Sequence, residues 1–168
     1  AVEYGVDDTT QNGRGTALAD ILYDGRLGII IGNWNGYHRV YVPLRDSFLD
    51  YATDEFREPS KVRTVISADF DNDGYDEIFF NNIGQPNRMF RVREGGLLEP
   101  VLLSAALEAN GLGTGAAVAD IDNDGVLDLL VAHGERAPQP LSLFRADIDS
   151  PRRYLRIAPL TEHGAPAR

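Results

Sequence analysis

The sequence predicts an all-β fold, a β-propeller made of four-stranded antiparallel blades, of which about three are present. Three observations support this prediction. An acidic loop recurs three times at nearly constant spacing, a strand-like apolar run follows each loop, and a second apolar strand that carries an aromatic ring follows each run. Tandem four-stranded units of this length are typical of propeller blades.

The repeat is visible in the spacing of the residues that open the loops. Asp20, Asp69 and Asp120 lie 49 and 51 residues apart, and each ends a small apolar approach, "GTALAD", "TVISAD" or "GAAVAD". The aromatic rings, Tyr41, Phe90 and Phe144, follow the opening aspartates after 21, 21 and 24 residues. The predicted blades therefore cover about residues 12–58, 59–110 and 111–150.

Each unit is predicted to run strand, acidic loop, strand, turn, strand, with room for a fourth, weaker strand. The second strands are the apolar runs "LGIIIG", "EIFFNN" and "LDLLVAHG", and the turns after the first two contain Gly, Asn or Pro, as in "NWNGYH" and "IGQPN". One segment, 102–111, has good helix formers and a terminal glycine, so it is the single helix candidate.

Three blades are too few for a closed ring, because propellers close with about four to eight blades. The first and last blades would expose unpaired edges. Two alternatives remain open: the chain is a segment of a larger propeller, or several copies complete the ring.

Composition excludes several classes of function. The formal charge of −10 over 168 residues disfavours nucleic acid and anionic membranes as partners and favours cations or basic partners. No apolar run reaches the roughly 18 residues that membrane insertion requires. The absence of cysteine excludes disulfides, thiolate zinc sites and cysteine nucleophiles.

The second and third loops have ligands at calcium-binding spacing, D-x-D-x-D-G-x-x-[DE]. Calcium takes six to eight oxygen ligands, and alternate residues of a tight loop point to a common centre. The predicted ligands of the second loop are Asp69, Asp71, Asp73, the backbone carbonyl of Tyr75, and Glu77. Those of the third loop are Asp120, Asp122, Asp124, the backbone carbonyl of Val126, and Asp128. Two bound calcium ions are therefore expected.

The first loop, residues 20–28, is degenerate and is predicted to bind no metal or to bind it very weakly. Leu22 stands where the second aspartate should be, and Gly28 stands where the closing acid should be. An EF-hand is excluded for the other two loops, because it needs an acid at position 12 and flanking helices. Position 12 is Phe80 in one loop and Val131 in the other.

The motifs "GRGTALAD", "VRTVISADFDNDGYDEIFFNN" and "GTGAAVADIDNDGVLDLLVAHGE" resemble the FG-GAP repeats of integrin-alpha-like propellers, and together they resemble the cartilage acidic protein family. The resemblance covers nearly the whole chain. It implies a secreted extracellular-matrix protein with a propeller of about seven blades followed by an ASPIC/UnbV-type domain. Residues 1–150 would then belong to the propeller, and 151–168 would be a linker and the start of that domain.

The sequence therefore favours a calcium-stabilised interaction or adhesion module with no catalytic chemistry of its own. Its partners would be calcium, a protein or matrix component, and further blades or other copies at the open edges. The alternative is a propeller hydrolase or lyase with a catalytic divalent cation. His38, His133 and His163 show no arrangement with Ser or Asp that suggests catalysis, so they are interpreted as packed or surface residues.

Overall fold

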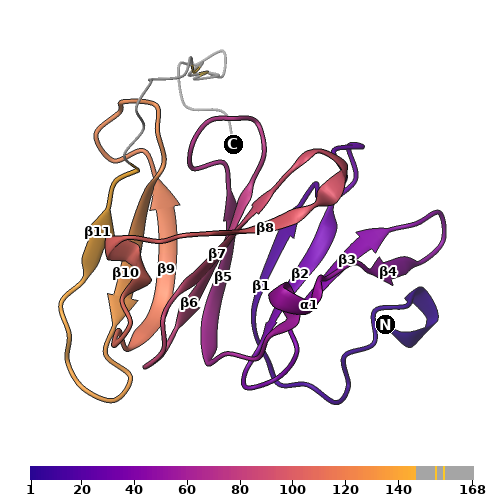
Figure 1. Ribbon diagram of the computed structural model, residues 1–168, viewed down its shortest axis with the longest axis horizontal. Helices are drawn as coiled ribbons and strands as arrows, with labels where there is room; N and C mark the ends of the chain where they lie inside the picture. Colours follow the sequence, from indigo (N-terminus) through magenta and orange to yellow (C-terminus); the bar gives the residue numbers. More distant parts are fainter. Residues whose placement is uncertain (147–153, 155–156, 158–168) are drawn as a thin grey trace, which may run out of the picture.

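The computed structural model describes residues 1–146, 154 and 157, and it consists of three antiparallel sheets that stand side by side (Figure 1). Blade 1 contains β1 (Gly13–Ala19), β2 (Gly28–Asn33), β3 (Arg39–Pro43) and β4 (Phe48–Asp50). Blade 2 contains β5 (Val62–Ala68), β6 (Glu77–Asn82), β7 (Arg88–Val92) and β8 (Leu98–Val101). Blade 3 contains β9 (Gly113–Ala119), β10 (Asp128–His133) and β11 (Ser142–Phe144).

The predicted all-β propeller architecture is confirmed. Strands in each sheet follow chain order, and the first strands, β1, β5 and β9, are neighbours (Figure 1). The weak fourth strand exists in blades 1 and 2 as β4 and β8. In the part of the chain that the structure describes, blade 3 has three strands.

Cross-strand register is the same in all three blades. The residue before each loop pairs with the last residue of the loop, as Ala68 does with Glu77. The predicted aromatic rings then lie opposite the next residue of the second strand, in the pairs Ile29–Tyr41, Ile78–Phe90 and Leu129–Phe144. Equivalent positions of the blades can therefore be compared directly.

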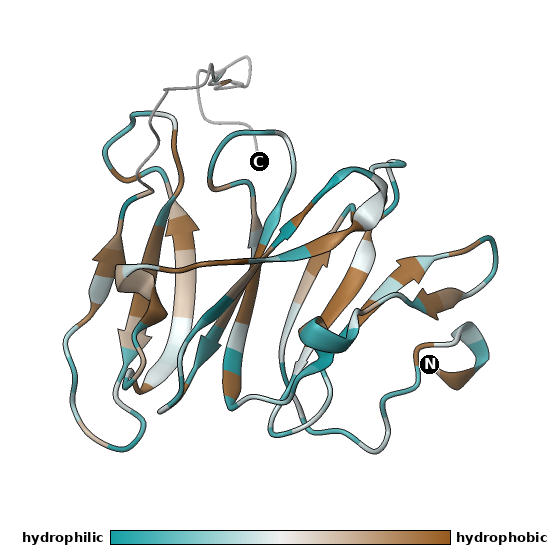
Figure 2. Ribbon diagram, viewed as in Figure 1, coloured by the Kyte–Doolittle hydropathy of each residue, from teal (hydrophilic) through white to brown (hydrophobic). Residues whose placement is uncertain are grey.

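The apolar core lies between the blades. One cluster joins the face of blade 1 that carries Ile30 and Val40 to the face of blade 2 that carries Ile78 and Phe80. A second cluster joins the opposite face of blade 2 to blade 3 through a set of residues that includes Phe79, Leu129 and Val131. Figure 2 shows the apolar residues following the strands and the hydrophilic residues in the loops at their ends.

A polar relay runs through each junction between blades. The Asn33 N–H donates to His38 Nδ1 (3.0 Å), His38 Nε2 lies 3.0 Å from Ser60 Oγ, and the Ser60 hydroxyl donates to Asn82 Oδ1 (2.8 Å). At the next junction Asn87 accepts from the Asn82 N–H (2.8 Å) and donates to Glu108 (3.3 Å). Glu108 in turn lies 3.0 Å from His133 Nε2.

Helical structure differs from the expectation. The candidate segment 102–111 forms only one turn of 3-10 helix, Ala105–Leu107, because Glu108 takes a left-handed conformation (φ 41°) that ends it. An unpredicted short helix, α1 (Asp54–Arg57), follows blade 1, and the Thr53 side chain caps it by accepting from the Phe56 N–H (3.2 Å). The Phe56 ring is fully buried between those of Phe80 and Phe90, at centroid distances of 5.2 and 4.8 Å.

Residues 1–146 also contain the 3-10 turns Val2–Tyr4 and Glu94–Gly96. No helix in the described part of the chain is long and apolar enough to cross a membrane.

Candidate calcium-binding loops

The three acidic loops lie at the same end of their blades, at the top of the molecule in Figure 1. They share one backbone shape, with a left-handed residue at position 4 and a left-handed glycine at position 6. Position 4 is Tyr23, Asn72 or Asn123 (φ 54°, 55° and 62°), and position 6 is Gly25, Gly74 or Gly125 (φ 83°, 89° and 87°). Glycine has no Cβ and adopts this conformation without strain.

The opening aspartate fixes this shape through backbone hydrogen bonds. Asp69 accepts from the N–H groups of Asp73 (3.0 Å) and Gly74 (2.9 Å). In the degenerate first loop, Asp20 accepts in the same way from the residues at positions 5 and 6 (3.1 and 2.8 Å). The loop shape is therefore set by the chain itself, and a full ligand set is not needed to form it.

The closing acids are buried and accept from the backbone at position 2. Glu77 is 1% exposed and accepts from the Phe70 N–H (3.0 Å). Asp128 is 4% exposed and accepts from the Ile121 N–H (3.1 Å). The first loop has Gly28 at this position and makes no such bond. The closing acid thus ties each of the two complete loops to the start of its second strand.

In the second loop three of the predicted side-chain ligands converge. Asp69, Asp71 and Glu77 each offer an oxygen such that these atoms lie within 4.8 Å of one another. Asp73 accepts from the Tyr75 N–H (2.9 Å) and lies 3.5 Å from the Arg93 guanidinium. Coordination by the Tyr75 carbonyl stays a prediction.

In the third loop the converging set is Asp120, Asp122 and Asp124, again within 4.8 Å. Asp120 Oδ2 accepts from the Gly125 N–H (3.1 Å), but its Oδ1 is buried and has no hydrogen-bond partner among the described residues. A buried carboxylate oxygen without a donor is costly, and a bound cation would satisfy it. The residues of this loop therefore fit a divalent ion. Coordination by the carbonyl of Val126 and by Asp128 stays a prediction.

In the second loop the ionised forms of two carboxyl groups, those of Asp69 and Glu77, are disfavoured. Burial, with added repulsion from Asp73 and Asp71, raises the pKa of Asp69 despite its two backbone hydrogen bonds. Burial also raises the pKa of Glu77, and this effect outweighs the opposing influence of the Arg91 guanidinium and the Phe70 N–H. A nearby cation would favour the ionised form of both groups.

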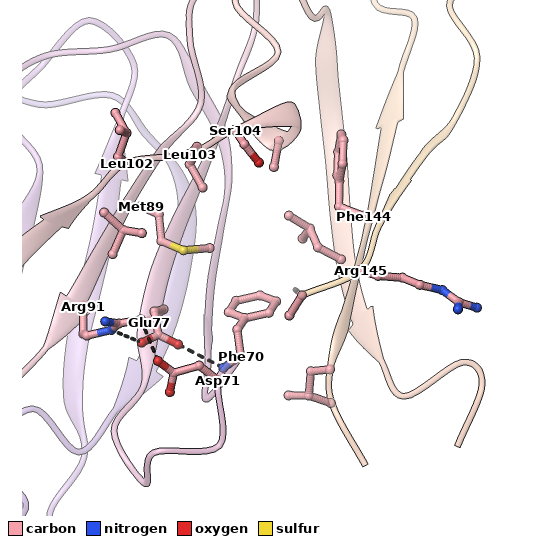
Figure 3. A pocket seen from close by; sticks show the side chains of 15 residues that line it. Phe70, Asp71, Glu77, Met89, Arg91, Leu102, Leu103, Ser104, Phe144 and Arg145 are labelled. Atoms are coloured by element: carbon pink, nitrogen blue, oxygen red, sulfur yellow. Dashed lines mark hydrogen bonds and ion pairs between the residues drawn. The ribbon is translucent and has the colours of Figure 1, made fainter. Parts of the chain in front are cut away.

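Two arginines contact these acids, Arg91 in β7 and Arg145 directly after β11, and the sequence analysis did not predict either contact. Arg91 donates to Glu77 Oε1 (2.8 Å) and to Asp71 Oδ2 (2.6 Å), as Figure 3 shows. In the third loop Arg145 lies 2.9 Å from Asp122. Arg91 could have been identified from its position opposite Glu77 in the cross-strand register, but this position is known only when β6 and β7 are aligned.

The loops also contact one another. The hydroxyl of Tyr23 accepts from the Asp76 N–H (2.7 Å), and the Tyr23 and Tyr75 rings meet edge to face with centroids 4.2 Å apart. Partial burial and the charges of acids in the second loop raise the pKa of Tyr23 to about 12. Asn72 donates from its side chain to the Gly125 carbonyl (2.7 Å). A chain of contacts thus links the first loop to the second and the second to the third.

A cavity of about 290 Å³ lies between blades 2 and 3, next to the second loop (Figure 3). Most of its lining is apolar, and the ion-paired Arg91, Glu77 and Asp71 lie at one end. Its position places the second loop at the border of the inter-blade core.

Comparison with known proteins agrees with this architecture. Residues 69–131 match the FG-GAP-like repeat. The chain is 50% identical over 180 aligned residues to cartilage acidic protein 1 of Homo sapiens and 49% identical over 180 to that of Mus musculus. It is 47% identical over 176 to that of Xenopus tropicalis. These alignments cover 98–100% of the chain but only 27–28% of each relative, so the chain spans about a quarter of their length.

The ASPIC/UnbV-like start predicted at 151–168 lies outside the described residues, apart from Tyr154 and Ile157, as does His163. Three observations indicate the same family: the repeated blades, the two complete acidic loops, and a similarity that covers nearly the whole of this chain. The chain is a homologue of cartilage acidic protein 1 that carries an FG-GAP-like repeat, and it belongs to the cartilage acidic protein family.

Proposed function

We propose that this chain binds two calcium ions, one in each complete acidic loop, and that the ions stabilise a propeller segment of an extracellular-matrix interaction module. The observation that carries the proposal is the convergence of three carboxylates in each of two equivalent loops. Oxygen-only ligand sets of this kind suit calcium. The unpartnered Oδ1 of Asp120 supports the same assignment.

The role proposed for calcium is stabilisation. An ion that binds only the folded state adds RT ln(1 + [Ca]/Kd). With a Kd of about 10⁻⁴ to 10⁻³ M, as in many extracellular modules, calcium at about 1 mM contributes roughly 0.4 to 1.4 kcal/mol per site. This contribution is of the same size as a single hydrogen bond, so the blades would fold without the ion and become more stable with it.

The matrix assignment is supported by the cartilage acidic protein relatives and by the acidic net charge of −10. The same relatives support secretion and a protein or matrix partner, because their name places them in cartilage. A catalytic role for the ions is the alternative. No observation on the described residues favours it, since the carboxylates of both loops are bound by backbone N–H groups or arginines of the same blade.

Further blades are proposed to cover the two outer faces. On blade 3, Leu130 pairs with Ala117 and Leu143 in one row, and the two leucines are 36% and 47% exposed. The equivalent row of blade 2 contains Phe79 and is packed against blade 3. The exposed row of blade 3 therefore corresponds to the rows through which blades 1 and 2 pack against the blade that follows them.

Isothermal titration of the chain with calcium tests the proposal. Two sites are expected in the unchanged chain, and Asp71→Ala and Asp122→Ala are each expected to remove one. Asp24→Ala is the matched control, because it removes an aspartate from the equivalent degenerate loop and should leave both sites intact. A titration that finds one site or none in the unchanged chain would refute the assignment.

A further inference from the structure

We infer that Arg91 is an internal counter-ion of the second loop, which occupies two of the calcium-binding carboxylates when the ion is absent and is displaced when calcium binds. This inference rests on the proposed calcium site. It adds that a built-in cation lowers the dependence of the fold on calcium and also lowers the calcium affinity of that loop.

The contacts of Arg91 are those of a cation shared between two ligands. Its Nε donates to Glu77 Oε1 (2.8 Å) and one terminal nitrogen donates to Asp71 Oδ2 (2.6 Å). Both acids belong to the set whose oxygens lie within 4.8 Å of one another. A planar guanidinium can bridge two carboxylates in this way, whereas an ammonium group acts as a point charge.

Because Glu77 and Asp71 are shielded from water, their charges depend on the ion pairs with Arg91 for compensation. The Glu77 side chain is 1% exposed and that of Asp71 is 23% exposed, so neither charge is fully hydrated. Asp69 and Asp73 add negative charge to the same loop, and Arg93 partly balances it through Asp73 while it also pairs with Glu99 of β8. Among these contacts, Arg91 is the one that reaches the buried closing acid.

The third loop, whose ligand set is also complete, has a contact that corresponds in part to this arrangement, and the degenerate first loop lacks it. The strand register pairs Arg91 with Glu77. Arg145 directly follows Phe144, the last residue of β11, which pairs with Leu129 next to Asp128. Arg145 lies 2.9 Å from Asp122, which is the equivalent of Asp71.

The degenerate first loop has neither partner. By the same register, Val42 occupies the place of the arginine, and Gly28 occupies the place of the closing acid. Its own Arg26 pairs instead with Asp24 at the loop tip. An arginine in the third strand, or directly after it, thus accompanies the closing acid in the described blades.

Displacement follows because Arg91 and the proposed calcium ion share two carboxylate groups, those of Asp71 and Glu77. Calcium bound by Asp71 and Glu77 places two positive charges within a few ångströms of the guanidinium, and like charges at that distance repel. Removing the guanidinium should therefore strengthen calcium binding at the second loop by up to about 30-fold, the factor expected for a divalent ion and one unit charge at roughly 4 Å in a largely aqueous dielectric.

The test is Arg91→Met in the full chain, which keeps the apolar stem and removes the charge and both hydrogen bonds. In the presence of chelator the thermal midpoint is expected to fall by several degrees relative to the unchanged chain. Added calcium is expected to raise the midpoint more in the variant than in the unchanged chain, and titration should show tighter binding at one of the two sites.

Arg93→Met is the matched control, since it removes the same charge beside the same loop without touching Glu77. Arg93→Met is expected to change the thermal midpoint in chelator and the calcium affinity less than Arg91→Met does. Arg91→Lys keeps the charge but not the bridge, so its chelator midpoint should lie between those of Met and Arg; this variant also serves if Arg91→Met does not fold.

Weaker or unchanged calcium binding in Arg91→Met would overturn the inference, because Arg91 would then position the ligands for the ion or have no influence on it. An unchanged midpoint in chelator would also overturn it. If the unchanged chain binds no calcium, the proposed function fails instead, and the midpoints in chelator still show whether Arg91 stabilises the loop.

Discussion

At the scale of single residues, His38 shows how burial controls a charge. The imidazole is fully buried, and its Nδ1 accepts from the Asn33 N–H, so its Nε2–H is the donor to Ser60. Burial, helped by the positive charge of Arg88, lowers the pKa of His38 to about 4. The ring is therefore neutral in the folded protein at physiological pH. In blade 2 the uncharged Asn87 makes the equivalent hydrogen bond to Asn82.

His38→Asn is predicted to make the protein more resistant to acid. The unfolded chain protonates His38 near pH 6.5, whereas the folded chain does so only near pH 4. The stability associated with this residue is therefore complete above pH 6.5 and is lost as the pH falls toward 4, by on the order of 2 to 3 kcal/mol. Asparagine does not titrate and can accept the same N–H.

Urea unfolding of both forms at pH 7.5 and at pH 4.2 checks this prediction. Asp69 and Glu77, whose pKa values are raised, produce the opposite pH trend, but they are present in both proteins and cancel in the difference. Equal losses of stability on acidification in the two proteins would contradict the role assigned to His38.

At this scale the acids of the loops could be singled out from the sequence because they are close along the chain, and metal coordination by them stays a prediction. Nine consecutive positions contain the acids of each loop, and the structure brings three of them together in both complete loops. Arg91 was missed because 14 residues separate it from Glu77, and only sheet pairing brings the two together. His38 was interpreted as a packed or surface residue, and its polar relay through Ser60 spans two blades.

At the scale of elements, the first strands of neighbouring blades pack too closely for a side chain at one position. A Cβ added at Gly15 in β1 would lie 2.7 Å from the Val65 nitrogen and 3.0 Å from the Thr64 carbonyl carbon, both in β5. These atoms belong to the backbone and cannot rotate away. Gly15 thus permits the contact between blades 1 and 2.

Gly15→Ala is predicted to destabilise the chain by about 1 to 3 kcal/mol, the usual effect of overpacking. Gly115→Ala is the matched control at the equivalent position of β9, because its Cβ would meet nothing within 4 Å. That variant should be neutral or more stable by up to about 1 kcal/mol. Thermal unfolding of both variants is the measurement, and equal midpoints would show that blades 1 and 2 are not tightly docked at Gly15.

The strands were predictable because their apolar runs are bounded by turn residues and repeat at one period. The helices were not. The helix formers of 102–111 are overridden by the left-handed backbone at Glu108, whereas α1 depends on one capping threonine and on the burial of Phe56 in a neighbouring blade. The Thr53 cap and the acidic residues after it were a local signal that could have indicated α1.

At the scale of the whole molecule, the described residues form two inter-blade cores, and among them no further blade covers the outer faces of blades 1 and 3. The exposed face of blade 3 carries Leu130 and Leu143, and the equivalent apolar rows of blades 1 and 2 are packed against the following blade. Exposed apolar rows of this kind favour association.

The chain on its own is predicted to self-associate through this face, and Leu130→Asp is expected to reduce its mass in solution. Light scattering at matched concentrations, with and without chelator, is the measurement. Leu102→Asp is the control, because Leu102 is 98% exposed but lies outside the blade 3 row. A compact monomer of the unchanged chain would contradict the prediction.

The repeat period gave the architecture of the whole molecule, because each unit carries its own strands and loop. The repeat period did not predict which face of each blade packs against the next blade. Which side of each sheet meets the next blade depends on the register of residues such as Phe79 and Met89, and this register emerges only when the sheets are assembled.

The contact between Tyr23 and the second loop bears on the history of the repeats. A duplicated unit that loses its ligands would ordinarily be free to drift, yet the first loop still supports its neighbour through this tyrosine. Selection can therefore preserve its shape after its chemistry has gone. A repeat that has lost its metal ligands can therefore still have a structural role.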